Sequence, residues 1–183
     1  MHRVAGVLVL LAVSTVWSEE GVFLSEADAP KAVFPHAHEV AREEVAVTPE
    51  RRAHVVERLG GALPSMWEER WVIFRTSDGD VPLGRAVVVE EIGKHRPITF
   101  VVGLRPDGSV ADVAVMAYRE AYGGEIASRR FLAQYAGKRP EDELHAGRGI
   151  QNVAGATLSV EAASRAVHKA QAIVATLDQE PKP

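Results

Sequence analysis

Gln151-Asn-Val-Ala-Gly-Ala-Thr-Leu-Ser-Val160 is the segment around which the chain is organised, because a long helix is expected to begin at its end. The apolar residues from there onward recur three or four positions apart: Val160, Ala163, Val167, Ala170, Val174 and Leu177. This spacing predicts an amphipathic helix that buries one stripe against a core. Ser159 is the expected N-cap, with Thr157 as the alternative, because a hydroxyl oxygen accepts hydrogen bonds from the free N–H groups of a first helical turn.

The loop before this helix has the features of a phosphate site. Gly155 allows a positive φ angle or the close approach of a ligand to the backbone. Free backbone N–H groups, the positive end of the helix dipole and two nearby hydroxyls all favour a phosphate group. The alternative is a loop that only caps an ordinary amphipathic helix, and these residues alone leave both interpretations open.

The clearest turn signal lies upstream, where Arg105-Pro-Asp-Gly108 joins two runs rich in β-branched residues and predicts a β-hairpin. Strands are expected at residues 66–76, 83–92, 98–104 and 109–117, and helices at residues 25–34, 49–59 and 128–136 as well as after the Gly-Ala-Thr loop. Ser25 and Thr48 are the expected N-caps of the first two helices. Strands grouped between helices predict an α+β fold, with a mostly antiparallel sheet and flanking helices. The sequence contains no Gly-x-Gly-x-x-Gly or Walker motif, which argues against a Rossmann or P-loop nucleotide site.

The N-terminal residues have the pattern of an export signal. Met1-His-Arg3 is a short basic start, residues 4–17 are apolar, and Ser18 provides a small residue for cleavage before Glu19. A retained short anchor is the alternative, and either would place the remaining chain in the periplasm or on the extracytoplasmic face of the membrane. The expected organisation is a signal peptide or short anchor at residues 1–18, a helical and strand segment at 19–82, a domain at 83–178 and a polar tail at 179–183.

The amino-acid composition limits the partners and redox cofactors that the protein could use. The 183 residues include 21 basic and 25 acidic side chains, a formal net charge of −4, and no basic patch stands out, so nucleic acid is not an expected partner. Cysteine is absent. This excludes disulfides, haem attached through Cys-x-x-Cys-His, cysteine-bound iron–sulfur clusters and a lipidated cysteine anchor. Redox chemistry would have to come from a bound organic cofactor or from a metal held by histidines and carboxylates.

Two histidine-containing stretches are candidates for binding. His36-Ala-His38 places two imidazoles on one side of an extended segment, and a carboxylate from Glu39, Glu43 or Glu44 would complete a zinc or copper site. Two exposed polar residues are the alternative. Lys94-His-Arg-Pro97 is a basic stretch at the start of a strand, for which a solvated turn is preferred over a contact with a phosphate or an electron-transfer partner.

Gly155-Ala-Thr-Leu-Ser159, followed by a helix near the end of the domain, resembles the signature of the FMN-binding domain family. That family includes the flavin-carrying subunits of the Rnf and Nqr respiratory complexes and the periplasmic part of nitrous-oxide-reductase regulators. The resemblance extends over residues 98–110, 118–137 and the terminal helix, in family order. It implies that FMN is the cofactor and that Thr157 carries it through a phosphoester, installed by a flavin transferase. Gly155, Ala156, Leu158 and Ser159 would complete the phosphate loop.

The chain departs from the family pattern at two places. An Asp usually lies six positions before the acceptor and a Ser or Thr three before it, where this chain has Gln151 and Ala154. This affects the expectation of covalent attachment more than that of FMN binding. The family's loop after the hairpin, often Glu-Thr-Pro-Gly-Leu-Gly, lies near the flavin, and its counterpart here is Glu120-Ala-Tyr-Gly-Gly-Glu125.

The resemblance implies that this second loop borders the cofactor through Glu120, Tyr122, Gly123 and Gly124. Tyr122 would stack on the isoalloxazine ring, and the two glycines would let the backbone approach it. A tight turn that only joins a strand to a helix is the alternative.

These observations predict an exported FMN-binding electron-transfer protein with its FMN-binding domain at residues 83–178. Its expected partners are FMN, a flavin transferase and membrane or periplasmic redox proteins. The electron-transfer role is implied by the resemblance. Two alternatives remain open: a periplasmic metal-binding module that uses His36 and His38, and a flavin-dependent extracytoplasmic reductase with its own small substrate. No catalytic residue is assigned, because no Ser/His/Asp grouping or paired-carboxylate motif stands out.

Overall fold

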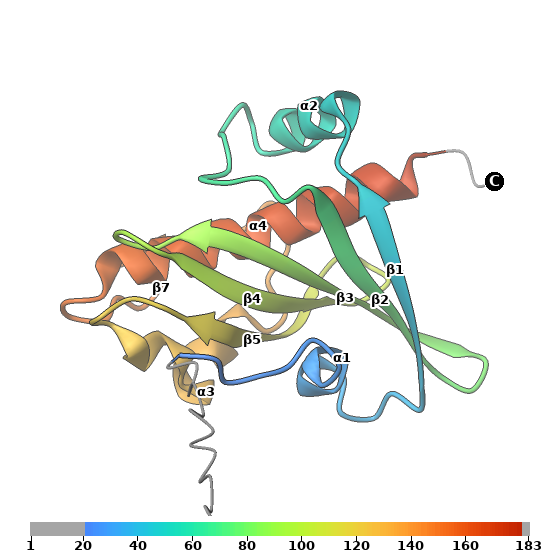
Figure 1. Cartoon of the computed structure of the whole chain (residues 1–183), viewed down its shortest axis with the longest axis horizontal. Helices are drawn as coiled ribbons and strands as arrows, with labels where there is room; N and C mark the ends of the chain where they lie inside the picture. The colour runs from blue at the N-terminus through green and yellow to red at the C-terminus, as the bar shows by residue number, and fades with distance from the viewer. Residues whose placement is uncertain (1–20, 181–183) are drawn as a thin grey trace, which may run out of the picture.

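Five antiparallel strands form one sheet whose spatial order, β1-β2-β3-β4-β5, follows the order of the chain. The computed structural model describes residues 21–180. The strands are β1 (Glu39–Ala46), β2 (Arg70–Asp78), β3 (Val81–Ile92), β4 (Pro97–Leu104) and β5 (Val110–Tyr118). Helices lie on both faces of this sheet (Figure 1), so the α+β class is confirmed.

The two faces of the sheet bury different apolar residues, because side chains alternate along each strand. One face contributes Val87, Val89 and Phe100 to a large cluster that also contains Val160 and Val167 of the C-terminal helix. The other face contributes a smaller set to a second cluster: Phe74, Ala86, Val101 and Met116, together with Ala29, Val33, Phe34 and Ala37. The sheet is therefore the middle layer of the protein.

The long helix α4 (Thr157–Asp178) covers the larger cluster and confirms the predicted C-terminal helix. Its buried surface is wider than one stripe, because α2 (Pro49–Arg58) packs on its outer side. The short helix α1 (Ala29–Val33) covers the opposite face of the sheet. Figure 1 shows α4 passing behind the strands, with α2 above it and α1 below the strands.

Two local predictions are confirmed in detail. The hairpin between β4 and β5 closes with a hydrogen bond from Gly108 N to the carbonyl of Arg105 at 2.9 Å, and Gly108 takes a φ of +80°, which favours glycine. Helix α2 begins after Thr48, whose side-chain oxygen accepts from Arg51 N at 3.3 Å. Pro49 fills the first helical position, where no N–H is needed.

Three element boundaries were predicted wrongly. The first helix begins at Ala29 after the N-cap Asp28 instead of after Ser25, so Pro30 lies in the first turn, where proline is tolerated. The strand predicted from residue 66 begins at Arg70. The helix expected at residues 128–136 is divided into α3 (Arg129–Leu132) and the 3-10 turn η2 (Ala133–Tyr135), although Ser128 does cap it.

Strand β1 was not predicted, because its residues do not show an apolar pattern. It lies at the edge of the sheet, and most of its side chains are exposed. The remaining short elements are η1 (Gly124–Ala127), β6 (His145–Ala146) and β7 (Gly149–Ile150). The sheet joins β1 and β2, which lie within residues 19–82, to β4 and β5, which lie within residues 83–178, and β3 crosses the boundary between these two segments.

Within residues 21–180, no helix is both long and apolar enough to cross a membrane. The export signal or anchor predicted at residues 1–18 lies outside the described residues.

Candidate cofactor site

Three segments far apart in the sequence meet at one cleft of about 500 Å³. They are the turn between β3 and β4, the loop after β5, and the start of α4. Its lining residues are Lys94, His95, Glu120, Ala121, Tyr122, Gly155, Ala156, Thr157, Leu158 and Ser159. The structure thus brings together the Gly-Ala-Thr loop and the loop after β5, both of which were predicted to bind the cofactor. Of the predicted site residues, only Gly123 and Gly124 do not line this cleft.

The start of α4 faces this cleft without a side-chain cap. Its N-cap is Ala156, and Thr157 is the first helical residue. Within the described chain, the backbone N–H groups of Thr157, Leu158 and Ser159 have no hydrogen-bond acceptor. Such free N–H groups at the positive end of a 22-residue helix favour an anion.

Ser159 is not the N-cap, which corrects the prediction from the sequence. It is the third residue of α4 and is only 4% exposed. Its Oγ lies 3.0 Å from the hydroxyl of Tyr118. The side chain is therefore used for a buried tertiary contact, and the helix start is left open.

The hydroxyl of Thr157 lies at the surface of the cleft. Thr157 is exposed, and its Oγ1 accepts a hydrogen bond from Asn152 Nδ2 at 3.0 Å. Gly155 takes a φ of +80°, and no atom lies within 4 Å of the position where a Cβ would be. The loop therefore presents an accessible hydroxyl beside free N–H groups.

Tyr118 ties the loop after β5 to the start of α4. Its hydroxyl donates to the carbonyl of Tyr122 at 2.5 Å and also contacts Ser159. Burial raises the pKa of Tyr118, so the hydroxyl stays protonated at neutral pH and can donate. A Cβ on Gly123 would lie 2.8 Å from that hydroxyl and 3.0 Å from the Cβ of Ala156, so glycine is needed for this close packing.

Glu120 organises the third wall of the cleft. Its Oε1 accepts hydrogen bonds from the backbone N–H groups of His95 at 2.5 Å and Arg96 at 2.9 Å. Burial raises the pKa of Glu120, but these N–H groups and that of Lys94 outweigh it and leave the pKa below its ordinary value. Glu120 is thus an ionised carboxylate that holds the β3–β4 turn.

Lys94 and His95 line the cleft and were missed as site residues, since the basic stretch was interpreted as a solvated turn. Both residues are exposed. The sequence did show a basic run, Lys-His-Arg-Pro, at this position. That this run lies beside the start of α4 follows only from the pairing of β3 with β4.

The histidines of the metal-binding alternative do not form a multidentate site. His38 Nδ1 lies 2.7 Å from Asp78 Oδ1, with both side chains exposed, and His36 is also exposed. Across residues 21–180, no group of three or more His, Cys, Asp or Glu side chains is arranged to hold a metal ion. The described residues therefore give this alternative no support.

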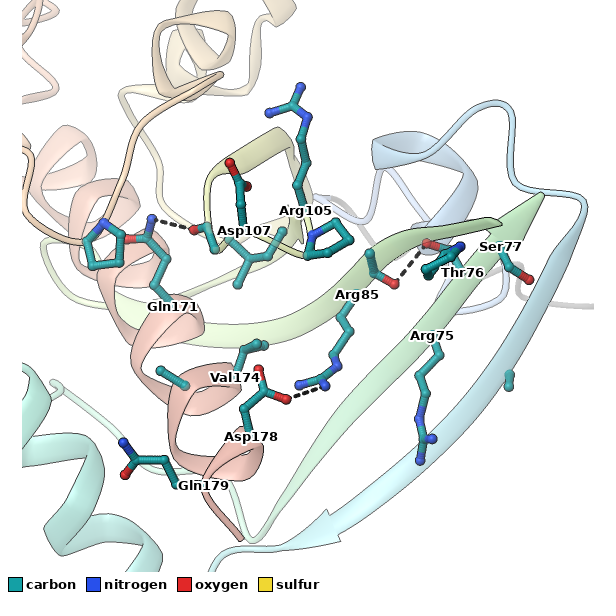
Figure 2. Close-up of a pocket in the computed structure, with 18 of the residues that line it drawn as sticks. Arg75, Thr76, Ser77, Arg85, Arg105, Asp107, Gln171, Val174, Asp178 and Gln179 are labelled. Atoms are coloured by element: carbon teal, nitrogen blue, oxygen red, sulfur yellow. Dashed lines mark hydrogen bonds and ion pairs between the residues drawn. The ribbon is translucent and has the colours of Figure 1, made fainter. Parts of the chain in front are cut away.

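A larger cleft, of about 840 Å³, lies at the other end of α4 and contains none of the predicted site residues (Figure 2). Its lining includes Arg75, Arg85, Gln171 and Asp178. Arg85 and Asp178 point toward each other and form an ion pair, and Arg75 pairs with Glu43. Two arginines of this cleft are thus paired with carboxylates of the protein. Arg58 donates instead to the hydroxyl of Thr176, and Arg105 donates to the carbonyl of Val110.

Residues 93–172 match the family model described as the FMN-binding domain. This segment is an FMN-binding domain. It contains all three walls of the 500 Å³ cleft, and FMN is its cofactor. No curated protein matches the chain.

The residues of the cleft fit FMN. The uncapped start of α4 suits the phosphate, as argued above, and the cleft volume lies within the usual range for small-molecule sites. Tyr122 and Leu158 are 86% and 51% exposed, so an apolar ring placed between the two loops would cover apolar surface that is otherwise in water.

Replacing Tyr122 by Ala is expected to change the fluorescence or the midpoint potential of bound FMN without preventing FMN binding. The reason is that contact with the ring and anchoring of the phosphate are separate interactions. Because Tyr122 is exposed, its ring contributes little to the core, and the substitution should leave the stability of the protein unchanged. Fluorescence spectra and redox titration of both proteins test this, and identical values would place Tyr122 away from the ring.

Proposed function

We propose that this protein is an exported electron carrier whose FMN is joined through its phosphate to Thr157. The observation that carries the proposal is the uncapped start of α4, where free N–H groups lie beside the exposed Thr157 hydroxyl in a cleft of the FMN-binding domain. Phosphate binding at such a helix start is a common use of backbone N–H groups.

The residues of the loop have distinct roles in this proposal. The N–H groups of Thr157, Leu158 and Ser159 bind the phosphate, and Asn152 holds the Thr157 side chain by its hydrogen bond. Attachment forms a bond between Thr157 Oγ1 and phosphorus. The donor is an activated flavin phosphate such as a flavin dinucleotide, whose phosphoanhydride bond breaks while the nucleotide half leaves and the hydroxyl proton is released.

Electron transfer is supported by the openness of the cleft rim. Tyr122 and Leu158 are exposed, so a partner protein could approach the isoalloxazine ring closely. Bound FMN supplies reversible one- and two-electron redox chemistry. The expected partners are membrane or periplasmic redox proteins, in keeping with the export signal predicted at residues 1–18.

Intact-mass measurement of the protein produced with and without a flavin transferase tests the proposal. A mass increment of one FMN less water, only in the presence of the transferase, together with a flavin absorption spectrum, is the expected result. A colourless protein that gains no mass and binds no added FMN would refute it. N-terminal sequencing of the exported protein tests the location, and an intact Met1 in a soluble cytoplasmic fraction would contradict export.

A further inference from the structure

We propose that Lys94 is the side chain that selects FMN over unphosphorylated flavins, and that Glu120 is the positioning residue that holds it at the cleft. This inference rests on the proposed placement of the flavin phosphate at the start of α4. It assigns a cation to the phosphate that neither loop of the family motif contains.

The β3–β4 turn is built around the Glu120 carboxylate. Gly93 N donates to the carbonyl of Arg96 at 3.0 Å and closes the turn, while Glu120 Oε1 accepts from the N–H groups of His95 and Arg96. A Cβ on Gly93 would lie 2.9 Å from Glu120 Oε1, so a glycine lets the carboxylate reach the turn from the neighbouring loop. The position of Lys94 is therefore coupled to Glu120.

The charge of Lys94 is available to a ligand. Within the described part of the chain, no carboxylate oxygen lies within ion-pair distance of its ammonium. Glu120 is the single acid among the residues that line the cleft, and its Oε1 is engaged by backbone N–H groups. Backbone N–H groups of the turn thus bind this carboxylate, and the ammonium of Lys94 is not needed for it.

Lys94 lines the same cleft as the free N–H groups of Thr157, Leu158 and Ser159. A phosphate at the start of α4 would therefore meet a cation from one wall and N–H donors from the other. Ammonium–phosphate contacts are charge-assisted and favour a dianionic phosphate over a neutral hydroxyl. Riboflavin, which has the same ring but no phosphate, would gain nothing from Lys94.

The experiment uses full-length protein produced without a flavin transferase, so that FMN and riboflavin bind reversibly. Equilibrium dialysis with each flavin, up to millimolar concentration, gives the two dissociation constants. Lys94→Gln is expected to weaken FMN binding about fivefold, a modest value because the lysine is exposed, and to leave riboflavin binding unchanged. Arg96→Gln is the matched control, because Arg96 belongs to the same turn but does not line the cleft, and it should change neither constant.

Glu120 is tested by the ratio of the FMN and riboflavin affinities, which a purely structural role would not change. Glu120→Ala should lower this ratio in the wild-type background and add little in the Lys94→Gln background. Glu120→Gln, which keeps an acceptor oxygen, should retain most of it. Circular dichroism checks that each variant is folded.

The outcomes separate the two proposals. Equal losses of FMN and riboflavin binding in Lys94→Gln, or no loss of either, would overturn the role of Lys94 while leaving the proposed function intact. Additive effects of Glu120→Ala and Lys94→Gln would overturn the positioning role. Wild-type protein that binds neither flavin and forms no adduct would overturn the proposed function, and this inference with it.

Discussion

Replacing Thr157 by Ala is expected to abolish the mass increment of one FMN less water in protein that is co-produced with a flavin transferase. The phosphoester needs a side-chain hydroxyl that the transferase can reach, next to the N–H groups that hold the phosphate. Thr157 is exposed at the cleft, whereas Ser159 is 4% exposed and contacts Tyr118. Weak, dialysable FMN binding should remain, because the N–H groups are unaffected by the change.

Two variants serve as controls for this prediction. Ser159→Ala should keep the adduct and lower the free energy of unfolding by roughly 1 kcal/mol, because the buried Tyr118 hydroxyl loses a hydrogen-bond partner. Thr157→Ser should still be modified if the transferase accepts a primary alcohol. An adduct that survives Thr157→Ala would move the acceptor elsewhere. A wild-type protein without adduct would indicate that Gln151 and Ala154 disable the family motif.

The long elements were predictable because their signals are local. The spacing of apolar residues after Val160 is that of a helix, and the Pro-Asp-Gly turn ending at Gly108 is typical of a hairpin. Strand β1 was not predictable in the same way, because an edge strand with mostly exposed side chains has no apolar alternation. It forms through its backbone pairing with β2, which depends on the rest of the sheet.

The cofactor site was predictable only in part. The resemblance pointed to both loops, and the structure places Tyr122 and Thr157 on one cleft. The capping role of Ser159 was predicted wrongly because capping preferences describe a helix in isolation, and Tyr118 competes for the same hydroxyl. Lys94 was overlooked because its neighbours in space, including Glu120, come from other parts of the chain.

Lys169 is a buried charge that the helical spacing of apolar residues did not predict. It lies in α4 and is fully buried, although lysine is normally exposed. Its ammonium donates to the carbonyl of Met66 at 2.9 Å, to Glu68 Oε1 at 2.9 Å and to the carbonyl of Glu90 at 3.0 Å. These partners lie far away in sequence, so only the folded chain makes burial of this charge possible.

Replacing Lys169 by Ala is expected to lower the free energy of unfolding by about 3–5 kcal/mol, the range measured when one partner of a buried ion pair is removed. The change removes the ammonium donor from three acceptors. Glu68 then keeps a hydrogen bond from Glu90 N but has no ion-pair partner among the described residues. The side chain of Glu91 is 0% exposed, and its Oε1 lies 3.7 Å from the ammonium, so it also loses a compensating charge. Glu91 keeps its contact with Arg165 at 3.1 Å, which limits the loss.

Urea unfolding followed by circular dichroism measures this difference. Lys31→Ala is the control, since Lys31 is exposed on α1 and its removal should change the stability by less than about 0.5 kcal/mol. Lys169→Met separates charge from packing, because methionine fills much of the space of the lysine stem but donates no hydrogen bond. If charge dominates, Lys169→Met should be nearly as unstable as Lys169→Ala, and adding Glu68→Gln should recover part of the loss.

Lys169 also connects the FMN-binding domain to residues outside it. Met66 and Glu68 lie outside the matched residues 93–172, and they meet α4 through Lys169. Loss of the ammonium should therefore loosen the loop before β2 from the helix whose first residues are proposed to bind the phosphate. A stability change below about 1 kcal/mol in Lys169→Ala would contradict this and would mean that water replaces the ammonium among its acceptors.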